Sequence, residues 1–143
     1  MTLKVVLIYA KSQVLRERAA AVFADEKAVK GEMARDEIYP PLGIAILAAG
    51  LLQRGGYDVR LLDDSIEDFD KLRSTMEWAD VVGISSLTPN ARRARELGQI
   101  ARNELHKFVV MGGPHPTTNP EFFLEAGAAD ICVQGEGDLT LPE

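Results

Sequence analysis

Short runs of apolar, often β-branched residues alternate along this chain with longer segments that have a helical period. The short runs are flanked by turn-forming residues and are apolar throughout, which is typical of parallel strands covered on both faces. They span residues 3–9, 58–62, 81–85, 108–111 and 131–133. Because strands and helices alternate, the pattern predicts an α/β fold, with a doubly wound, five-stranded parallel sheet in a three-layer α/β/α arrangement.

Prolines and glycines mark the ends of three predicted helices. Proline is favoured at the first helical position, and the pairs Thr88-Pro89 and Asn119-Pro120 add a side chain that can serve as the N-cap. Gly55-Gly56 and Gly127 follow helical segments, where glycine ends a helix. These helices are expected over residues 42–54, 89–106 and 121–126, the first of them opened by Pro41.

A fourth helix is predicted between the second and third strands. Ser65 and Asp68, three residues apart, resemble a capping box, so the helix is expected to begin there and to reach about Trp78. Just ahead of it, the pair Asp63-Asp64 is expected to cap this helix rather than to bind a metal ion.

Two stretches depart from the regular alternation. Residues 10–39 are too many for a simple connection, and residues 12–30 favour helix, so we expect an extra helix or a mobile lid there. Residues 135–143 have the pattern of a loop that leaves the fifth strand and enters a helix that is cut off. We therefore expect residues 1–143 to form one domain, the N-terminal fragment of a longer protein.

The composition narrows the classes of protein. The chain has 143 residues, enough for one sizeable core, and its formal net charge of −6 argues against a general binder of nucleic acid or anionic membranes. No apolar run approaches the roughly 20 residues that span a bilayer, and the start is too quickly polar for a signal peptide. A cytoplasmic domain is expected. The single cysteine, Cys132, excludes an internal disulfide and an iron–sulfur cluster held by this segment alone, and it is expected to be a core residue.

Three loops predicted at one edge of the sheet have the composition of a ligand site. In doubly wound sheets, ligands bind beyond the carboxyl ends of the strands, near the point where the strand order reverses. Glycine, serine and threonine let a backbone approach a large ligand closely and offer N–H and hydroxyl donors. Any one such loop is equally well explained as a turn, but three on one edge favour a ligand. They are residues 85–88, 112–117 and 135–137.

Several familiar sites are absent from the sequence. The residues after the first strand contain neither the G-x-G-x-x-G of dinucleotide-binding folds nor an aspartate for phosphorylation, and no P-loop occurs. His106 and His115 have no spacing to cysteines or carboxylates that suggests zinc. His106 is expected to end a helix, whereas His115, in a glycine-rich loop, is the better functional candidate. The sequence therefore predicts no catalytic residue and no metal site.

Taken together, these loops match a known family. The matching segments, in order, are 39–49 (YPPLGIAILAA), 56–59 (GYDV), 82–86 (VGISS), 112–117 (GGPHPT) and 135–137 (GEG). They resemble the N-terminal cobalamin (vitamin B12)-binding domain of cobalamin-dependent radical SAM proteins, which include methyltransferases and the anaerobic magnesium-protoporphyrin ester cyclase type. The resemblance covers nearly the whole chain and implies a flavodoxin-like (Rossmann-like) fold.

One mark of the wider cobalamin-binding fold is missing. That fold carries D-x-H-x-x-G after the first strand, S-x-L after the third and G-G after the fourth. Ser85-Ser86-Leu87 fits the second mark and Gly112-Gly113 the third, but residues 10–13 contain no histidine. The resemblance therefore implies cobalamin with its own benzimidazole displaced and no protein imidazole on the cobalt. His115 is expected beside the nucleotide tail rather than beneath the cobalt.

The resemblance also implies which residues hold the cofactor. Small residues would line a slot for the nucleotide tail, and hydroxyl groups would bond to its base or phosphate. Residues 40–43 would pass along the corrin, and Glu136 with its neighbouring backbone would meet the corrin amides. The implied cofactor-binding residues are Leu42, Gly43, Ser85, Ser86, Leu87, Thr88, Gly112, Gly113, Pro114, His115, Gly135, Glu136 and Gly137.

In this family the chemistry lies in another half of the protein. A radical SAM domain holds a [4Fe-4S] cluster on a CxxxCxxC motif and cleaves S-adenosylmethionine. The resemblance thus implies that this segment holds cobalamin and has the C-terminal radical SAM domain of the same chain as its partner. Two other interpretations stay open. One is a flavodoxin-like enzyme that uses flavin or another nucleotide, and the other is a degenerate, non-binding interaction domain.

Overall fold

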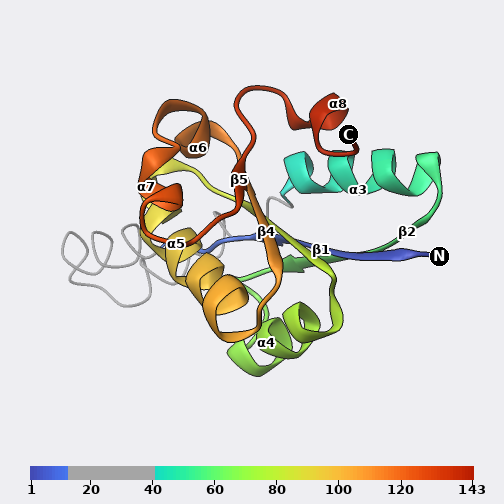
Figure 1. Ribbon diagram of the computed structural model, residues 1–143, viewed down its shortest axis with the longest axis horizontal. Coiled ribbons are helices and arrows are strands. Elements are labelled where there is room, and N and C mark those ends of the chain that lie inside the picture. The colour runs from blue at the N-terminus through green and yellow to red at the C-terminus, as the bar shows by residue number, and fades with distance from the viewer. Residues whose placement is uncertain (13–40) are drawn as a thin grey trace, which may run out of the picture.

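The centre of the molecule is a five-stranded sheet in which all strands run parallel (Figure 1). The structure is a computed structural model that describes residues 1–12 and 41–143. The strands are β1 (Leu3–Tyr9), β2 (Tyr57–Asp63), β3 (Val81–Ser85), β4 (Phe108–Gly112) and β5 (Ile131–Cys132). Their order, β2-β1-β3-β4-β5, is that of a flavodoxin-like fold, which confirms the predicted fold class.

Helices cover both faces of this sheet. On one face lie α3 (Leu42–Arg54) and the short α8 (Gly137–Thr140), and on the other lie α4 (Phe69–Trp78) and α5 (Ala91–Gln99) (Figure 1). The other elements are the 3₁₀ turn η1 (Thr88–Asn90), the π-helical turn η2 (Ile100–Glu104), α6 (Pro114–Thr118) and α7 (Glu121–Leu124). Within residues 1–12 and 41–143, no helix is long and apolar enough to cross a membrane.

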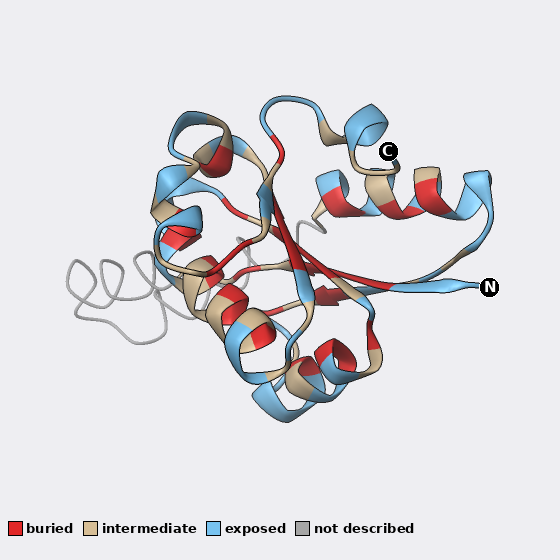
Figure 2. Cartoon of the chain, viewed as in Figure 1, coloured by how far each residue is buried: buried red, intermediate tan, exposed pale blue. Residues whose placement is uncertain are grey.

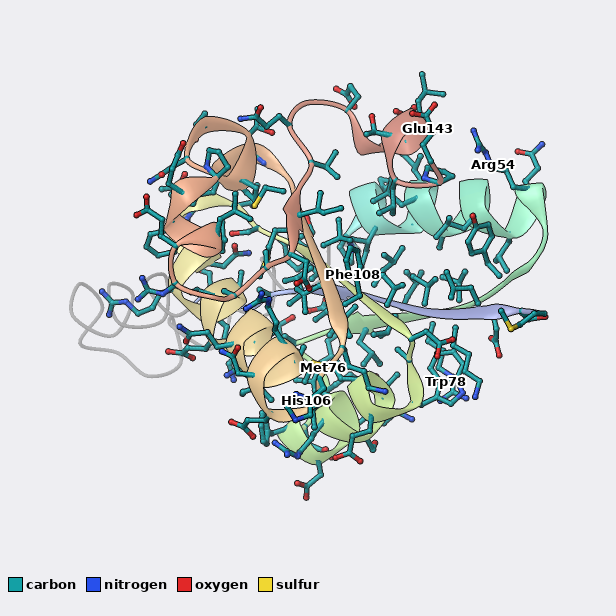
Figure 3. All side chains as sticks on the ribbon, in the orientation of Figure 1. Arg54, Met76, Trp78, His106, Phe108 and Glu143 are labelled. Atoms are coloured by element: carbon teal, nitrogen blue, oxygen red, sulfur yellow. The ribbon has the colours of Figure 1, made fainter. Side chains whose placement is uncertain are left out.

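Strands β1, β2 and β3 contribute to two separate cores, because successive side chains point to opposite faces. Val6 and Ile8 of β1 belong to the larger core, which packs under α4 and α5. Val5 and Leu7 belong to a smaller core under the apolar side of α3. Figure 2 shows the buried residues along the strands and on the helix sides that face them. Figure 3 shows Met76 among the side chains between α4 and the sheet, in the larger core.

The predicted elements agree with the structure in order and type. The bounds of β1, β3 and α3 coincide with the predicted ranges, while β2, β4 and β5 differ at their ends by one residue. The helix α7 ends at Leu124, short of residue 126, and Gly127 follows with a φ of +66°. The helix expected after the fifth strand begins at Gly137. The extra helix or lid expected within residues 10–39 falls beyond Ser12, outside the described residues.

Two helix starts differ from the prediction. Asp68 alone is the N-cap of α4, where its side chain accepts a hydrogen bond from the Lys71 N–H at 2.7 Å. Ser65 takes no part, because its hydroxyl donates to Asp63 within a preceding turn. The pair Thr88-Pro89 opens η1, so the α-helical part begins only at Ala91. That helix also ends early, at the π-helical turn closed by Glu104 rather than at residue 106.

Candidate functional site

A cavity of about 580 Å³ opens at the carboxyl edge of the sheet, between α3, strands β3 and β4 and the loop that leads into α8. Its volume lies in the range of roughly 300–1,000 Å³ that is common for small-molecule sites. We call it the edge cavity. Of the residues predicted to hold a ligand, those that line it are Gly43, Ser85, Gly112, Gly113, Pro114, Gly135, Glu136 and Gly137.

The edge cavity exists because small residues occupy one face of β3 and β4. In the register of these strands, Gly83 lies opposite Val110 and Ser85 opposite Gly112. The helix α3 packs over β1 and β2 and leaves this part of the face uncovered. A Cβ built on Gly112 meets no atom within 4 Å, so a side chain there would extend into open space. Gly112 and Ser85 therefore leave space for a ligand at the strand ends, whereas Gly83 makes room for Leu7, whose side chain would lie 2.6 Å from a Cβ at that position.

Ser86 and Gly113 serve a different purpose, because they join the loops after β3 and β4. The Ser86 N–H donates to the Gly112 carbonyl at 2.9 Å, and the Ser86 carbonyl accepts from the His115 N–H at 3.2 Å. Gly113 has a φ of +107°, and a Cβ there would lie 2.6 Å from the Ser86 carbonyl oxygen. Gly113 is thus required by the contact between the loops, in addition to lining the edge cavity.

The sequence analysis missed a buried asparagine that ties this edge together. Asn90 is 2% exposed. Its Nδ2 donates to the Ala10 carbonyl at 2.7 Å, and its Oδ1 accepts from the Leu87 N–H at 2.7 Å. It therefore connects the end of β1 to the loop after β3. The signal in the sequence was slight, because an asparagine after Thr-Pro is ordinary at the start of a helix.

The other predicted site residues, Leu42, Ser86, Leu87, Thr88 and His115, do not line the edge cavity. The side chains of Leu42 and Leu87 are exposed to solvent. The His115 ring contacts the Thr88 hydroxyl through Nδ1 at 3.3 Å and packs edge-on against Phe122 and Phe123. Its Nε2 atom is buried and has no hydrogen-bond partner among the residues that the structure describes. The structure thus places Thr88 and His115 beside the cavity rather than within it.

The prediction that Asp63-Asp64 caps α4 was wrong. Asp63 accepts hydrogen bonds from the backbone and side chain of Ser65, in the turn before the helix. Asp64 is buried and forms a two-bond ion pair with Arg93, at 2.8 and 2.9 Å. The hydrogen bonds from Arg93 to Asp64 raise the pKa of the guanidinium. The pair links α5 to the end of β2. No local pattern in the sequence indicates this contact, because the two residues are 29 positions apart.

Cys132 lies where the sequence placed it, in β5 and against the larger core. It is half-buried, its thiol donates to the Pro120 carbonyl at 3.7 Å, and burial raises the pKa of the thiol. Within residues 1–12 and 41–143, no group of three or more His, Cys, Asp or Glu side chains is placed to hold a metal ion.

Comparison with known proteins identifies the family. The model of the B12-binding domain family matches residues 34–143. The chain belongs to the B12-binding domain family. The segment after β4 and the loop into α8, which line the edge cavity, both fall within the matched range.

Relatives of this B12-binding domain include named enzymes. An uncharacterized methyltransferase of Pyrococcus horikoshii is 39% identical over 110 residues, which cover 73% of this chain and 24% of the relative. The anaerobic magnesium-protoporphyrin IX monomethyl ester cyclase of Rubrivivax gelatinosus is 37% identical, over 72% of this chain and 20% of that protein. The hopanoid C-3 methylase of Methylococcus capsulatus is 31% identical, over 72% and 21%. The chain thus spans about a fifth of the length of these relatives.

The lining of the edge cavity has the mixture of apolar and polar groups that the nucleotide tail of cobalamin would need. The tail has an apolar aromatic base at one end and a sugar phosphate at the other. The cavity wall is apolar where it meets α3 and the sheet, and glycines and hydroxyl groups stand at the strand ends. Several residues that make this wall were not predicted, because their sequence signal is that of ordinary core positions: Leu7, Ile44, Leu47, Val110, Val133 and Leu141.

Proposed function

We propose that this domain binds one cobalamin, with the nucleotide tail in the edge cavity and the corrin over the carboxyl edge of the sheet. The open space beside Gly112 carries the proposal, because a parallel strand in the middle of a sheet ordinarily presents a side chain to each face. Bound cobalamin supplies a cobalt centre for methyl transfer or radical chemistry. The residues of this chain hold and orient it.

The proposed roles follow from the positions of the residues. Ser85, Gly112 and the neighbouring Gly113 form the side of the slot that the sheet provides. Gly43 and the residues around Gly135–Gly137 line the opposite side, where backbone N–H groups can meet polar parts of the cofactor. Thr88 and His115 lie beside the slot. We place them next to the nucleotide tail, and not in contact with its aromatic base.

We infer that no imidazole of this segment replaces the displaced benzimidazole on cobalt. The residues described after β1 are Ala10, Lys11 and Ser12, and none of them has an imidazole. The ring of His115 is held by Thr88 and two phenylalanines after the fourth strand. Electron paramagnetic resonance of bound cob(II)alamin should show cobalt hyperfine lines without nitrogen splitting. Nitrogen splitting that vanishes in His115→Ala would make His115 the axial ligand instead.

We further propose that the domain works within a longer radical SAM protein, as a holder of cobalamin for methyl transfer or radical-assisted cyclisation. Two of the relatives described above are named as a methyltransferase and a methylase, and a third as an ester cyclase. All are several times longer than the matched segment, which leaves room for a catalytic half. The expected partner is a C-terminal radical SAM domain with a CxxxCxxC motif, a [4Fe-4S] cluster and S-adenosylmethionine. Sequencing the gene beyond the codon for Glu143 tests this directly.

Cobalamin binding is tested by mixing the chain with hydroxocobalamin, removing free cofactor by gel filtration and recording the visible spectrum. The expected result is a coloured protein peak with one cobalamin per chain. The same experiment with flavin mononucleotide tests the alternative of a flavin enzyme. A colourless peak with hydroxocobalamin together with retained flavin would replace the proposal with that alternative. A peak that retains neither would favour a non-binding interaction domain.

A further inference from the structure

The inner part of the edge cavity is apolar, and its charged side chains stand at the mouth. Leu7, Ile44, Val110 and Val133 line it and are at most 8% exposed. Glu136, also part of the lining, is exposed. A group that enters the cavity therefore leaves water and polar side chains behind as it reaches the inner end.

The threonine hydroxyls of the lining already donate their protons to the backbone. The Thr117 hydroxyl donates to the Gly113 carbonyl at 2.8 Å and accepts from the Gly135 N–H at 3.0 Å. The Thr118 hydroxyl is 3.2 Å from the Pro114 carbonyl, to which it donates. Ser85 adds one hydroxyl, at the end of β3. Among the described residues of the lining, few side-chain donors are thus left for a polar group that is buried here.

We propose that the edge cavity selects among cobamides by their lower base, and that it favours a benzimidazole over a purine. This inference rests on the proposed binding of the nucleotide tail. Adenine has ring nitrogens and an amino group along its edge, which would lose water among Leu7, Ile44 and Val110 without gaining partners. Dimethylbenzimidazole presents methyl groups on that edge, and its one free ring nitrogen needs a single donor.

The inference is tested with the dissociation constants of three corrinoids: cobalamin, a cobamide with adenine as the lower base, and cobinamide, which lacks the nucleotide. The quantity of interest is the ratio of the adenine-cobamide constant to the cobalamin constant, which we call the base ratio. The two free cobamides differ in how readily the base leaves cobalt. That difference belongs to the free corrinoid, so it cancels when the base ratio is compared between variants.

Val110→Thr places a hydroxyl in the inner wall with little change in volume and keeps a β-branched residue in β4. We expect it to lower the base ratio about threefold to tenfold, because a polar base edge then has a partner. Val133→Thr is a second variant of the same kind from a different segment. Val59→Thr is the matched control, because it makes the same substitution on the α3 face of the sheet, in β2 and outside the edge cavity. It should leave the base ratio unchanged.

The outcomes separate this inference from the proposed function. If cobalamin binds and the base ratio falls in Val110→Thr or Val133→Thr but not in Val59→Thr, base selection by the inner wall is supported. If both cobamides bind and the base ratio is the same in all four proteins, the inference is wrong while the proposed function stands. Cobinamide that binds as tightly as cobalamin would overturn it too, because the tail would then contribute nothing. If no corrinoid binds, the proposed function itself fails.

Discussion

The two faces of the sheet are built from alternate residues of the same strands, and they differ in how completely they are closed. On the face under α4 and α5, β3 contributes Val82 and Ile84, both at most 2% exposed. On the other face, β3 contributes Gly83, against which the Leu7 side chain packs, and Ser85, and both residues line the edge cavity. We call these the closed face and the open face.

The difference teaches how one sheet can carry both stability and a site. Filled interiors are packed about as densely as organic crystals, so an unfilled volume forfeits contacts that would stabilise the fold. Here that loss is confined to the part of the open face that α3 does not cover. A ligand that occupies the edge cavity restores those contacts. When the cavity is empty, the packed core of the closed face still stabilises the strands.

The sharpest test of the comparison uses two neighbouring glycines. Gly113→Val should destabilise the fold by more than about 3 kcal/mol, since its φ of +107° and the Ser86 backbone both oppose a β-branched side chain. Gly112→Val should keep the fold, because its side chain enters open space, and should weaken cobalamin binding at least about tenfold. Circular dichroism, urea unfolding and cobalamin titration measure both. A folded Gly112→Val variant with unchanged affinity would show that the tail does not pass this glycine.

A second test compares leucines of the two faces. Leu97 of α5 is fully buried in the closed face, so Leu97→Ala should lower the free energy of unfolding by about 2–5 kcal/mol. Leu47 of α3 is only half-buried and lines the edge cavity. Leu47→Ala should lower stability by less, roughly 1 kcal/mol, while it weakens cobalamin binding. Urea unfolding with and without cobalamin separates the two effects. Equal losses of stability would mean that the faces are packed alike.

Most of the fold could be predicted from the sequence because its elements carry local signals. The ends of α3 are marked by Pro41 and by Gly55, whose φ is +76°, and both ends agree with the structure. The helix α6 was missed because Gly113-Pro114 and a second proline, Pro116, are typical of a loop. A proline in the first turn of a helix removes an N–H that has no partner there in any case, so a short helix tolerates both.

The site was only partly predictable, because much of it depends on contacts between distant residues. Glycines and serine at the strand ends indicated an edge site, and several of them line the cavity. The buried pairs Asn90–Ala10 and Arg93–Asp64 join residues 80 and 29 positions apart, and no local pattern marks them. The role of Ser86 depends likewise on its backbone contact with the loop after β4.

Asn90 provides a third test, at the carboxyl edge of the sheet, where it joins the loops after β1 and β3. Asn90→Ala leaves the Leu87 N–H and the Ala10 carbonyl without their present partner, which should cost about 1–3 kcal/mol. The loop after β3 would also lose part of its support, so cobalamin binding should weaken by more than this loss of stability alone explains. Affinity is measured well below the unfolding transition. Asn103→Ala, whose side chain makes an exposed contact with the Gly127 carbonyl, is the matched control and should leave affinity unchanged. Unchanged affinity in Asn90→Ala would confine the role of Asn90 to the fold.

The smallest expected effect concerns the edge of the closed face. Asp130 accepts hydrogen bonds from the Val109 N–H at 2.8 Å and from Arg102 of η2 at 2.9 Å, which fastens that turn to β4 and β5. Burial opposes ionisation, but these two donors outweigh it and hold the pKa of Asp130 below its ordinary value. Because the folded-state pKa is the lower one, the contribution to stability is present above the unfolded pKa of about 3.9 and is lost as the pH falls through the folded value.

Both side chains are partly exposed, so the contribution should be about 1 kcal/mol or less. Asp130→Asn removes the titrating group and keeps a side chain of the same shape. Its free energy of unfolding should lie slightly below that of the wild type at pH 7 and approach it as the pH falls below about 4. Urea unfolding at a series of pH values measures the difference. A difference that stays constant down to pH 3 would show that the charge of Asp130 does not fasten the closed face.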